Sequence, residues 1–277
     1  EEESEENIRH CVKNLLAETG AEIAEIEALY TSQGDDYAKV VREFVPCRRT
    51  VNCGEGAFGL LTSGLTSGIC ALSGTGSDIF YVKDGVILDI LGGWGYVLGD
   101  LGSGFWIGRE AACSLFHFME GTRPVSLLHQ KLMQEHGIHD KMDMFRVIYR
   151  QASPAYYVAS FCTTVGHAAQ EGDPESIALL KEAGNTLARR VCQMIEKHRL
   201  PEDTPVCTAG SVFRYCKDMR LAFETTMQSY LPKAAIHHPM YEPVIGGILY
   251  RMMENGVPLS EDTVRSFQAA YQPFWIL

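Results

Sequence analysis

Apolar and polar positions change their spacing along the 277 residues, and these changes predict an α/β protein. Near the start, segments with helical apolar spacing alternate with short apolar runs that suit strands. The predicted helices cover 8–16, 37–44 and 54–61, and the predicted strands cover 50–52 and the second half of 23–30, where a short helix is the alternative. Such alternation is typical of a lobe in which helices cover a sheet.

The stretch from 69 to 91 differs because its apolar runs are short and rich in β-branched and aromatic residues. The run 69–72 predicts one strand, and the runs 79–82 and 86–91 flank Lys83-Asp84-Gly85. An Asp-Gly pair between two such runs is a strong hairpin signal. Three consecutive strands are therefore expected here.

Helical spacing dominates the rest of the chain. The clearest helix is 174–198, which Asp173 can cap and which has Pro174 in its first turn. The other predicted elements are helices at 104–118, 125–137, 142–151, 156–170 and 213–231, and a strand at 205–208. A strand, a glycine turn and a helix in succession, as at 205–231, often contact a nucleotide.

Composition and charge exclude several classes of protein. The net charge of −11 argues against a nucleic-acid polymer as the main partner. No stretch approaches the roughly 20 apolar residues that a membrane span needs. The first six residues, EEESEE, are unlike the basic start of a secretion signal. We therefore expect a cytoplasmic protein that binds neither nucleic-acid polymers nor membranes.

The nine cysteines and nine histidines do not indicate a metal site. The cysteine count is odd and no pair has CxxC spacing, so reduced thiols are expected. The histidines lack HxxxH and HExxH spacing, and Cys47 with Cys53 lacks further ligands. The pair His237-His238 is expected on the surface. No residue is assigned to a metal.

Glycines are concentrated between 73 and 108, together with hydroxyl and acidic side chains. The turn SGTGS, residues 73–77, offers bare amides and hydroxyls that suit phosphate oxygens. Trp94 offers an apolar wall, and Asp100 offers a carboxylate for hydroxyl donors. A phosphate beside a hydroxyl-rich small molecule would fit this combination.

Each of these features also has an ordinary structural interpretation. The SGTGS turn could be only a tight hairpin, and Gly210 could be only a turn glycine. Trp94 alone would usually lie in a core, and Asp100 beside Gly99 would usually form a turn or cap a helix. We favour a ligand-binding site over these ordinary interpretations because the Gly-Thr-Gly turn, Trp94 and Asp100 occur together, in this order and at these distances.

In this order, the segments SGTGS, GGWG and GD-x-GSG-x-x-IG resemble the N-acetylglucosamine kinase branch of the BadF/BadG/BcrA/BcrD ATPase family. The resemblance covers about 8–249 and includes an adenosine-type motif at 206–213 and a P-x-x-G-[AG] segment at 243–247. It implies a two-lobed actin-like ATPase fold with RNase H-like lobes. Residues 1–66 would be the remainder of the N-terminal lobe. Residues 67–277 would form the C-terminal lobe, with the last helix packing back on the first.

The resemblance also implies ATP and Mg²⁺ between the lobes and an amino sugar deeper in the cleft. The residues expected to bind the nucleotide are Gly74, Thr75, Gly76, Ser77, Gly210 and Ser211. The residues expected to bind the sugar are Thr75, Gly93, Trp94 and Asp100. The residues expected to be catalytic are Asp100 and Glu55.

This chain departs from the family pattern in three places. The sequence does not contain the family's opening DGGGTKT-type phosphate loop. The first lobe is therefore expected to be incomplete at its N-terminus, as it would be if this chain began inside a longer protein. Cys53 stands where the family usually has the base aspartate, and Glu55 is the neighbouring carboxylate that could substitute. Leu101 stands where a glutamate is usual.

Three functions follow as alternatives. The first is an ATP-dependent kinase that phosphorylates the 6-hydroxyl of N-acetylglucosamine or a relative such as N-acetylmuramic acid. The second is a degenerate relative that binds sugar or nucleotide as a sensor, which Cys53 and Leu101 favour. The third is an ATPase that activates a dehydratase, although the cysteines lack the local pattern of a bridging iron–sulfur cluster. Homodimer formation stays open.

Overall fold

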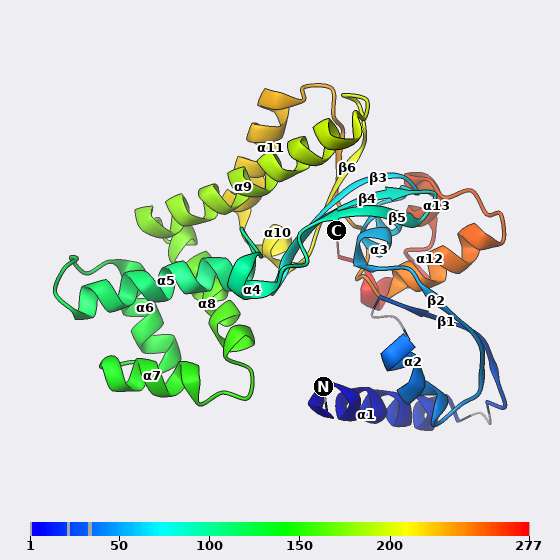
Figure 1. The fold of residues 1–277 in the computed structure, drawn as a ribbon, viewed down its shortest axis with the longest axis horizontal. Helices are drawn as coiled ribbons and strands as arrows, with labels where there is room; N and C mark the ends of the chain where they lie inside the picture. The colour runs from blue at the N-terminus through cyan, green and yellow to red at the C-terminus, as the bar shows by residue number, and fades with distance from the viewer. Residues whose placement is uncertain (1, 21–22, 33–34, 277) are drawn as a thin grey trace.

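The structure is a computed structural model, which describes residues 2–20, 23–32 and 35–276. Its strands form a five-stranded sheet in the order β5-β4-β3-β6-β7 and a separate parallel pair of β1 and β2 (Figure 1). The strands are β1 (Ile26–Thr31), β2 (Cys47–Asn52), β3 (Gly68–Ser73), β4 (Ser77–Lys83), β5 (Val86–Leu91), β6 (Val206–Ala209) and β7 (Ile236–His237).

The five-stranded sheet has the topology of an RNase H-like lobe, which confirms the expected fold class. Strands β3, β4 and β5 are antiparallel, whereas β6 and β7 run parallel to β3. The predicted β4–β5 hairpin is present, and its turn residues Asp84 and Gly85 have φ values of 51° and 76°. Positive φ at both central residues is the geometry that Asp-Gly pairs favour.

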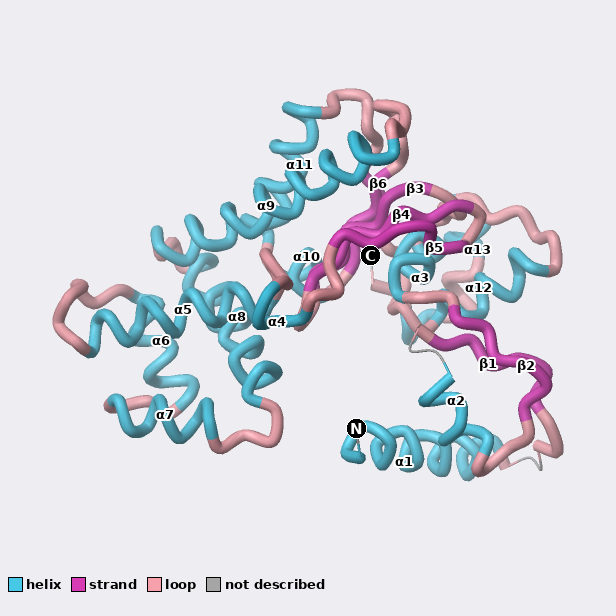
Figure 2. Tube along the Cα trace, viewed as in Figure 1, coloured by secondary structure: helices cyan, strands magenta, loops and turns pink. Residues whose placement is uncertain are grey.

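Helices surround the sheet and extend away from it on one side (Figure 2). The first six are α1 (Glu2–Thr19), α2 (Asp35–Arg42), α3 (Glu55–Thr62), α4 (Gly95–Leu98), α5 (Gly104–Met119) and α6 (Leu127–His136). The remaining ones are α7 (Lys141–Tyr149), α8 (Pro154–Gln170), α9 (Pro174–His198), α10 (Ser211–Tyr215), α11 (Lys217–Tyr230), α12 (Ile245–Glu254), α13 (Glu261–Ser266) and a 3₁₀ turn, Gln272–Phe274. No helix in these described ranges is both long and apolar enough to cross a bilayer.

The sheet separates two apolar cores. On one face, Ala57 and Leu60 of α3 pack against Cys70, Phe80 and other buried strand residues. On the other face, residues of β3 and β4 join the larger core that α5, α8, α9 and α11 build. Successive side chains of β3 alternate between the two layers, with Ile69 and Ala71 in the larger core and Cys70 facing α3. The β3–β4 turn lies at an end of the sheet, where a site can form.

Helix α12 is attached to the small sheet by charged side chains. Arg49 of β2 donates two hydrogen bonds to Glu254, at 2.9 and 2.6 Å, and Tyr30 of β1 donates a third at 2.5 Å. Arg251 donates to Glu27 at 2.6 Å. These contacts fix α12 beside β1 and β2, while the expected lobe boundary at 66/67 stays a prediction.

Most predicted elements occur where the sequence places them, and α9 has the expected start. Asp173 Oδ2 accepts a hydrogen bond from Ser176 N at 2.8 Å, with Pro174 in the first turn. The single helix predicted for 213–231 is wrong, because Cys216 leaves helical geometry (φ −101°, ψ 88°) and separates α10 from α11.

The histidine pair, expected on the surface, lies at an edge strand of the sheet and is partly buried. His237 belongs to β7 and lies opposite Cys207 of β6 in the sheet. His238 Nδ1 and Thr208 Oγ1 are 2.8 Å apart. His237 and His238 are both partly buried. A two-residue strand has too little pattern of its own to be found from sequence.

Candidate active site

The SGTGS segment is a tight turn between two strands. Ser73 ends β3 and lies opposite Ser77, which begins β4. Within the turn, Gly74 N donates to Gly76 O at 2.9 Å. The Thr75 side chain is exposed at the tip. The hairpin interpretation is therefore correct, and it is compatible with a site because the tip faces a cavity.

The start of α5 holds this turn through backbone contacts. Gly104 N donates to Gly74 O at 2.8 Å, and Phe105 N donates to Thr75 O at 3.1 Å. Below them, the Ser73 and Ser77 hydroxyls each donate to a carbonyl of the segment before α5 at 2.9 Å. These bonds fix the turn, so its remaining amides are pre-positioned for a ligand rather than mobile.

Asp100 lies directly against the turn. Its Oδ1 accepts a hydrogen bond from Ser77 N at 3.3 Å, and its carboxylate oxygens are 3.1–3.2 Å from the point where a Cβ on Gly76 would lie. The half-buried Asp100 adopts a left-handed backbone, φ 54°, which Asp tolerates better than most residues. The structure thus brings together Asp100 and the Gly-Thr-Gly turn.

The Gly-Gly-Trp segment follows β5 and is tied to the base of the same hairpin. Gly93 N donates to Asp78 Oδ1 at 2.5 Å. Trp94 precedes α4 and is 72% exposed, so it is not a core residue. Two cavities lie near the turn, and Trp94 is not among the described residues that line either of them.

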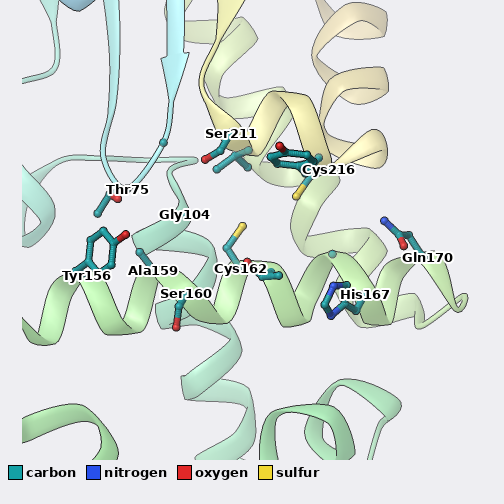
Figure 3. A pocket seen from close by; sticks show the side chains of 15 residues that line it. Thr75, Gly104, Tyr156, Ala159, Ser160, Cys162, His167, Gln170, Ser211 and Cys216 are labelled. Atoms are coloured by element: carbon teal, nitrogen blue, oxygen red, sulfur yellow. The ribbon is translucent and has the colours of Figure 1, made fainter. Parts of the chain in front are cut away.

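The first of these is the α8 cavity, of about 580 Å³, which lies between the turn, α8 and the α10–α11 junction (Figure 3). Thr75 and Tyr156 lie at one end, and His167 and Gln170 lie at the other. Its lining residues are Gly74, Thr75, Gly104, Tyr156, Ala159, Ser160, Cys162, Thr163, Gly166, His167, Gln170, Ser211, Val212, Tyr215 and Cys216. Sequence reasoning missed the whole contribution of α8, whose single glycine, Gly166, and hydroxyl residues look like ordinary helix residues.

Gly210 brings β6 and α10 to this cavity. Its φ is 98°, and a Cβ at this position would lie 2.1 Å from Ser73 O. Only glycine allows the ends of β3 and β6 to approach so closely. Ser211 consequently lines the α8 cavity together with Gly74 and Thr75.

The second is the α3 cavity, of about 810 Å³, on the other side of Ser211. Glu55, Gly210 and His238 are among its lining residues, and Ser211 and Tyr215 line both cavities. Glu55 is the first residue of α3, and it is not among the residues that line the α8 cavity. The structure places Glu55 in a neighbouring space, not beside Thr75.

Three carboxylates influence one another near the turn. The Glu55 side chain is exposed, yet nearby protein atoms reduce its hydration and raise its pKa, and the charge of Asp78 adds to this effect. Burial raises the pKa of Asp78, Asp100 raises it further, and the Gly93 N–H and Arg190 oppose the rise. Sequence reasoning missed Asp78, although an acidic residue opening an apolar strand was a usable signal.

Cys53 has no means of acting as a base at neutral pH. Its side chain is 3% exposed, and burial raises the pKa of its thiol to about 12, with a further contribution from Glu254. The thiol donates to Val51 O at 3.7 Å. The residue in the place of the expected aspartate is therefore a neutral core thiol.

A family model described as the BadF/BadG/BcrA/BcrD ATPase family matches residues 1–250. The chain belongs to this family. It is 26% identical over 188 residues to the N-acetylmuramic acid/N-acetylglucosamine kinase of Clostridium acetobutylicum. It is 27% identical over 193 residues to the N-acetyl-D-glucosamine kinase of Dictyostelium discoideum. Each match covers 68% of this chain, and 61% and 60% of those relatives respectively.

The fold of this family member is shared with a solved structure, a candidate N-acetylglucosamine kinase from Chromobacterium violaceum. The TM-score is 0.63 at 26% identity, and the alignment covers 83% of this chain and 77% of that chain. ATP use is the property that the family name implies.

Proposed function

We propose that this chain is an ATP-dependent amino-sugar kinase, which transfers the γ-phosphoryl group to the 6-hydroxyl of N-acetylglucosamine or a related sugar. The observation that carries the proposal is the contact between Asp100 and the Gly-Thr-Gly turn. It puts an acceptor for sugar hydroxyls next to amides that suit phosphate oxygens. The names of the relatives support the same chemistry.

In this proposal the nucleotide occupies the α8 cavity, whose volume is within the range of ordinary ligand pockets. The amides of Thr75 and Gly76 and the Thr75 hydroxyl would hold its phosphates. Gly210 would shape the wall, and Ser211 would face the adenosine. Phosphoryl transfer depends mainly on positioning and charge neutralisation, which a turn held by Gly104 and Phe105 can provide.

In this proposal the sugar lies against Asp100, Gly93 and Trp94. Asp100 would accept hydrogen bonds from its hydroxyls. Glu55, whose raised pKa brings it nearer neutrality, is our candidate for the base that takes the 6-hydroxyl proton. Since Glu55 lines the α3 cavity, the 6-hydroxyl would have to point from Asp100 towards α3.

Magnesium would neutralise phosphate charge during the transfer. Within the described ranges, no three His, Cys, Asp or Glu side chains converge as a ready-made ligand set. The ion would therefore be held mainly by nucleotide phosphates and water, as is usual for Mg²⁺ in kinases.

The test is calorimetry with N-acetylglucosamine and ATP on the wild type, Asp100→Asn and the exposed control Asp203→Asn. Loss of a charged hydrogen bond, about 1.5–3 kcal/mol, predicts roughly 10- to 150-fold weaker sugar binding in Asp100→Asn. ATP affinity and the circular dichroism spectrum should not change. Sugar affinity equal to that of wild type in Asp100→Asn would remove the assignment.

A sensor without turnover is the second candidate, and the neutral Cys53 thiol favours it. Release of ADP in a coupled assay with a panel of amino sugars separates the two. Robust turnover by the wild type excludes the sensor. Turnover that occurs only in Cys53→Asp, with sugar binding intact in both proteins, supports it.

A further inference from the structure

Two cysteines face each other in the wall of the α8 cavity. Cys162 lies on α8, and Cys216 lies at the junction of α10 and α11. Figure 3 shows their sulfur atoms turned towards one another. The side chains are only 6% and 5% exposed, and both belong to the cavity lining. A small reagent that enters the cavity therefore reaches both thiols.

The two thiols differ in acidity because each lies in the other's surroundings. Their interaction lowers the pKa of Cys216 and raises that of Cys162. Burial and the charge of Asp218 oppose the lowering at Cys216. Cys216 also precedes the first turn of α11, a position that favours a thiolate. Cys216 is thus the better nucleophile, with Cys162 poised beside it.

Helix α8 comes close to the Cys216 sulfur at Gly166. A Cβ on Gly166, one turn after Cys162, would lie 3.7 Å from Cys216 Sγ. A larger side chain at 166 would occupy the space beside the sulfur. Gly166 therefore leaves room for the Cys216 sulfur beside α8.

A second pair of thiols provides an internal comparison. Cys70 and Cys207 lie opposite each other on β3 and β6, and Cys207 raises the pKa of the Cys70 thiol. Both are 0% exposed between the sheet and α3, and they line neither cavity. The two pairs thus have similar chemistry but opposite access to reagents.

We propose that Cys162 and Cys216 form a thiol-modification site, which hydroperoxides convert to a disulfide. The Cys216 thiolate attacks one peroxide oxygen, the O–O bond breaks, and Cys216 sulfenic acid and an alcohol or water form. Cys162 then loses its proton and attacks the Cys216 sulfur, and the S–O bond breaks as water leaves. Two thiols lose two electrons and two protons, and one hydroperoxide is reduced.

The disulfide would join α8 covalently to the α10–α11 junction across the α8 cavity. If the nucleotide occupies that cavity, it blocks the access of peroxide, and the disulfide in turn hinders nucleotide binding. This consequence rests on the proposed function. The formation of the disulfide does not.

The test is oxidation of the whole chain with tert-butyl hydroperoxide, followed by alkylation, intact-mass measurement and non-reducing peptide mapping. We expect a loss of 2 Da per bond formed, peptides linked through Cys162 and Cys216, and full reversal by dithiothreitol. Cys162→Ser and Cys216→Ser should each abolish the link, whereas Cys70→Ser should retain it. If both thiols stay alkylatable after unfolding while exposed Cys11 is oxidised, or if other cysteines pair, the inference is wrong.

A second arm repeats the oxidation with saturating ATP and Mg²⁺. Slower formation of the Cys162–Cys216 link supports both proposals. A link that forms at the same rate supports the modification site and contradicts the nucleotide position. No link at all, in a protein that calorimetry shows to bind ATP, overturns the modification site and leaves the proposed function intact.

Discussion

Asp78 Oδ1 accepts a hydrogen bond from the Gly93 backbone N–H at 2.5 Å. The bond joins the base of the β3–β4 hairpin to the Gly-Gly-Trp segment, so two glycine-rich segments that are separate in sequence have one position relative to each other. The Asp78 carboxylate is half-buried, and its pKa is raised by burial and by Asp100. Asp78 therefore contributes to the fold mainly as a hydrogen-bond acceptor and less through its charge.

We therefore expect Asp78→Ala and Asp78→Asn to differ. Alanine removes the protein acceptor of the exposed Gly93 N–H, and urea unfolding should show a loss of about 0.5–1.5 kcal/mol. Asparagine keeps an acceptor oxygen and should lose less than half of that. Equal losses in the two variants would contradict the role of the hydrogen bond.

Gly210→Ala should be among the most disruptive single substitutions in this chain. The added Cβ would lie 2.1 Å from Ser73 O, at a backbone φ of 98°. Gly172 is the matched control, because it has a similar φ of 89° but no atom within 4 Å of the added Cβ. Gly172→Ala thus measures the backbone cost alone. We expect Gly210→Ala to lose at least about 2 kcal/mol more in urea unfolding.

The contact of Glu254 with Arg49 predicts a dependence of stability on pH. Arg49, and then Tyr30, lower the pKa of Glu254 from 4.5 to about 2. A carboxyl whose pKa is lower in the folded protein stabilises it above pH 4.5, and this stabilisation disappears as the pH falls towards 2. The difference in unfolding free energy between wild type and Glu254→Gln should therefore shrink over that range.

The control for this pH series is Glu202→Gln, which removes a solvent-exposed pair with Lys233. Exposed pairs contribute little, so this variant should follow the wild type at each pH. A Glu254→Gln profile parallel to that of wild type between pH 4.5 and 2 would show that the ion pair does not stabilise the fold.

Cys53 should resist alkylation in the native protein. Burial raises the pKa of its thiol to about 12, so almost no thiolate exists at pH 8, and the side chain is 3% exposed. Iodoacetamide should modify exposed Cys11 first and reach Cys53 only after unfolding. Peptide mapping over time measures this order. Early labelling of Cys53 would contradict both its burial and its exclusion as a base.

Elements with a strong local signal were predictable from sequence. Asp84-Gly85 forms its hairpin because both residues tolerate positive φ, and Asp173 caps α9 because its carboxylate reaches a nearby backbone N–H. The break at Cys216 was not predictable, since helical apolar spacing continues across it.

The sequence alone indicated the family, most of the strands and helices before residue 210, and the proximity of Asp100 to the Gly-Thr-Gly turn, because these depend on residues close together in the chain. Tertiary structure decided what surrounds that turn. It added Asp78 and the wall of α8, and it exposed Trp94 and put Glu55 in a second cavity. The physical reason is that a cavity forms between elements remote in sequence, and its position depends on how their buried faces pack rather than on any single segment.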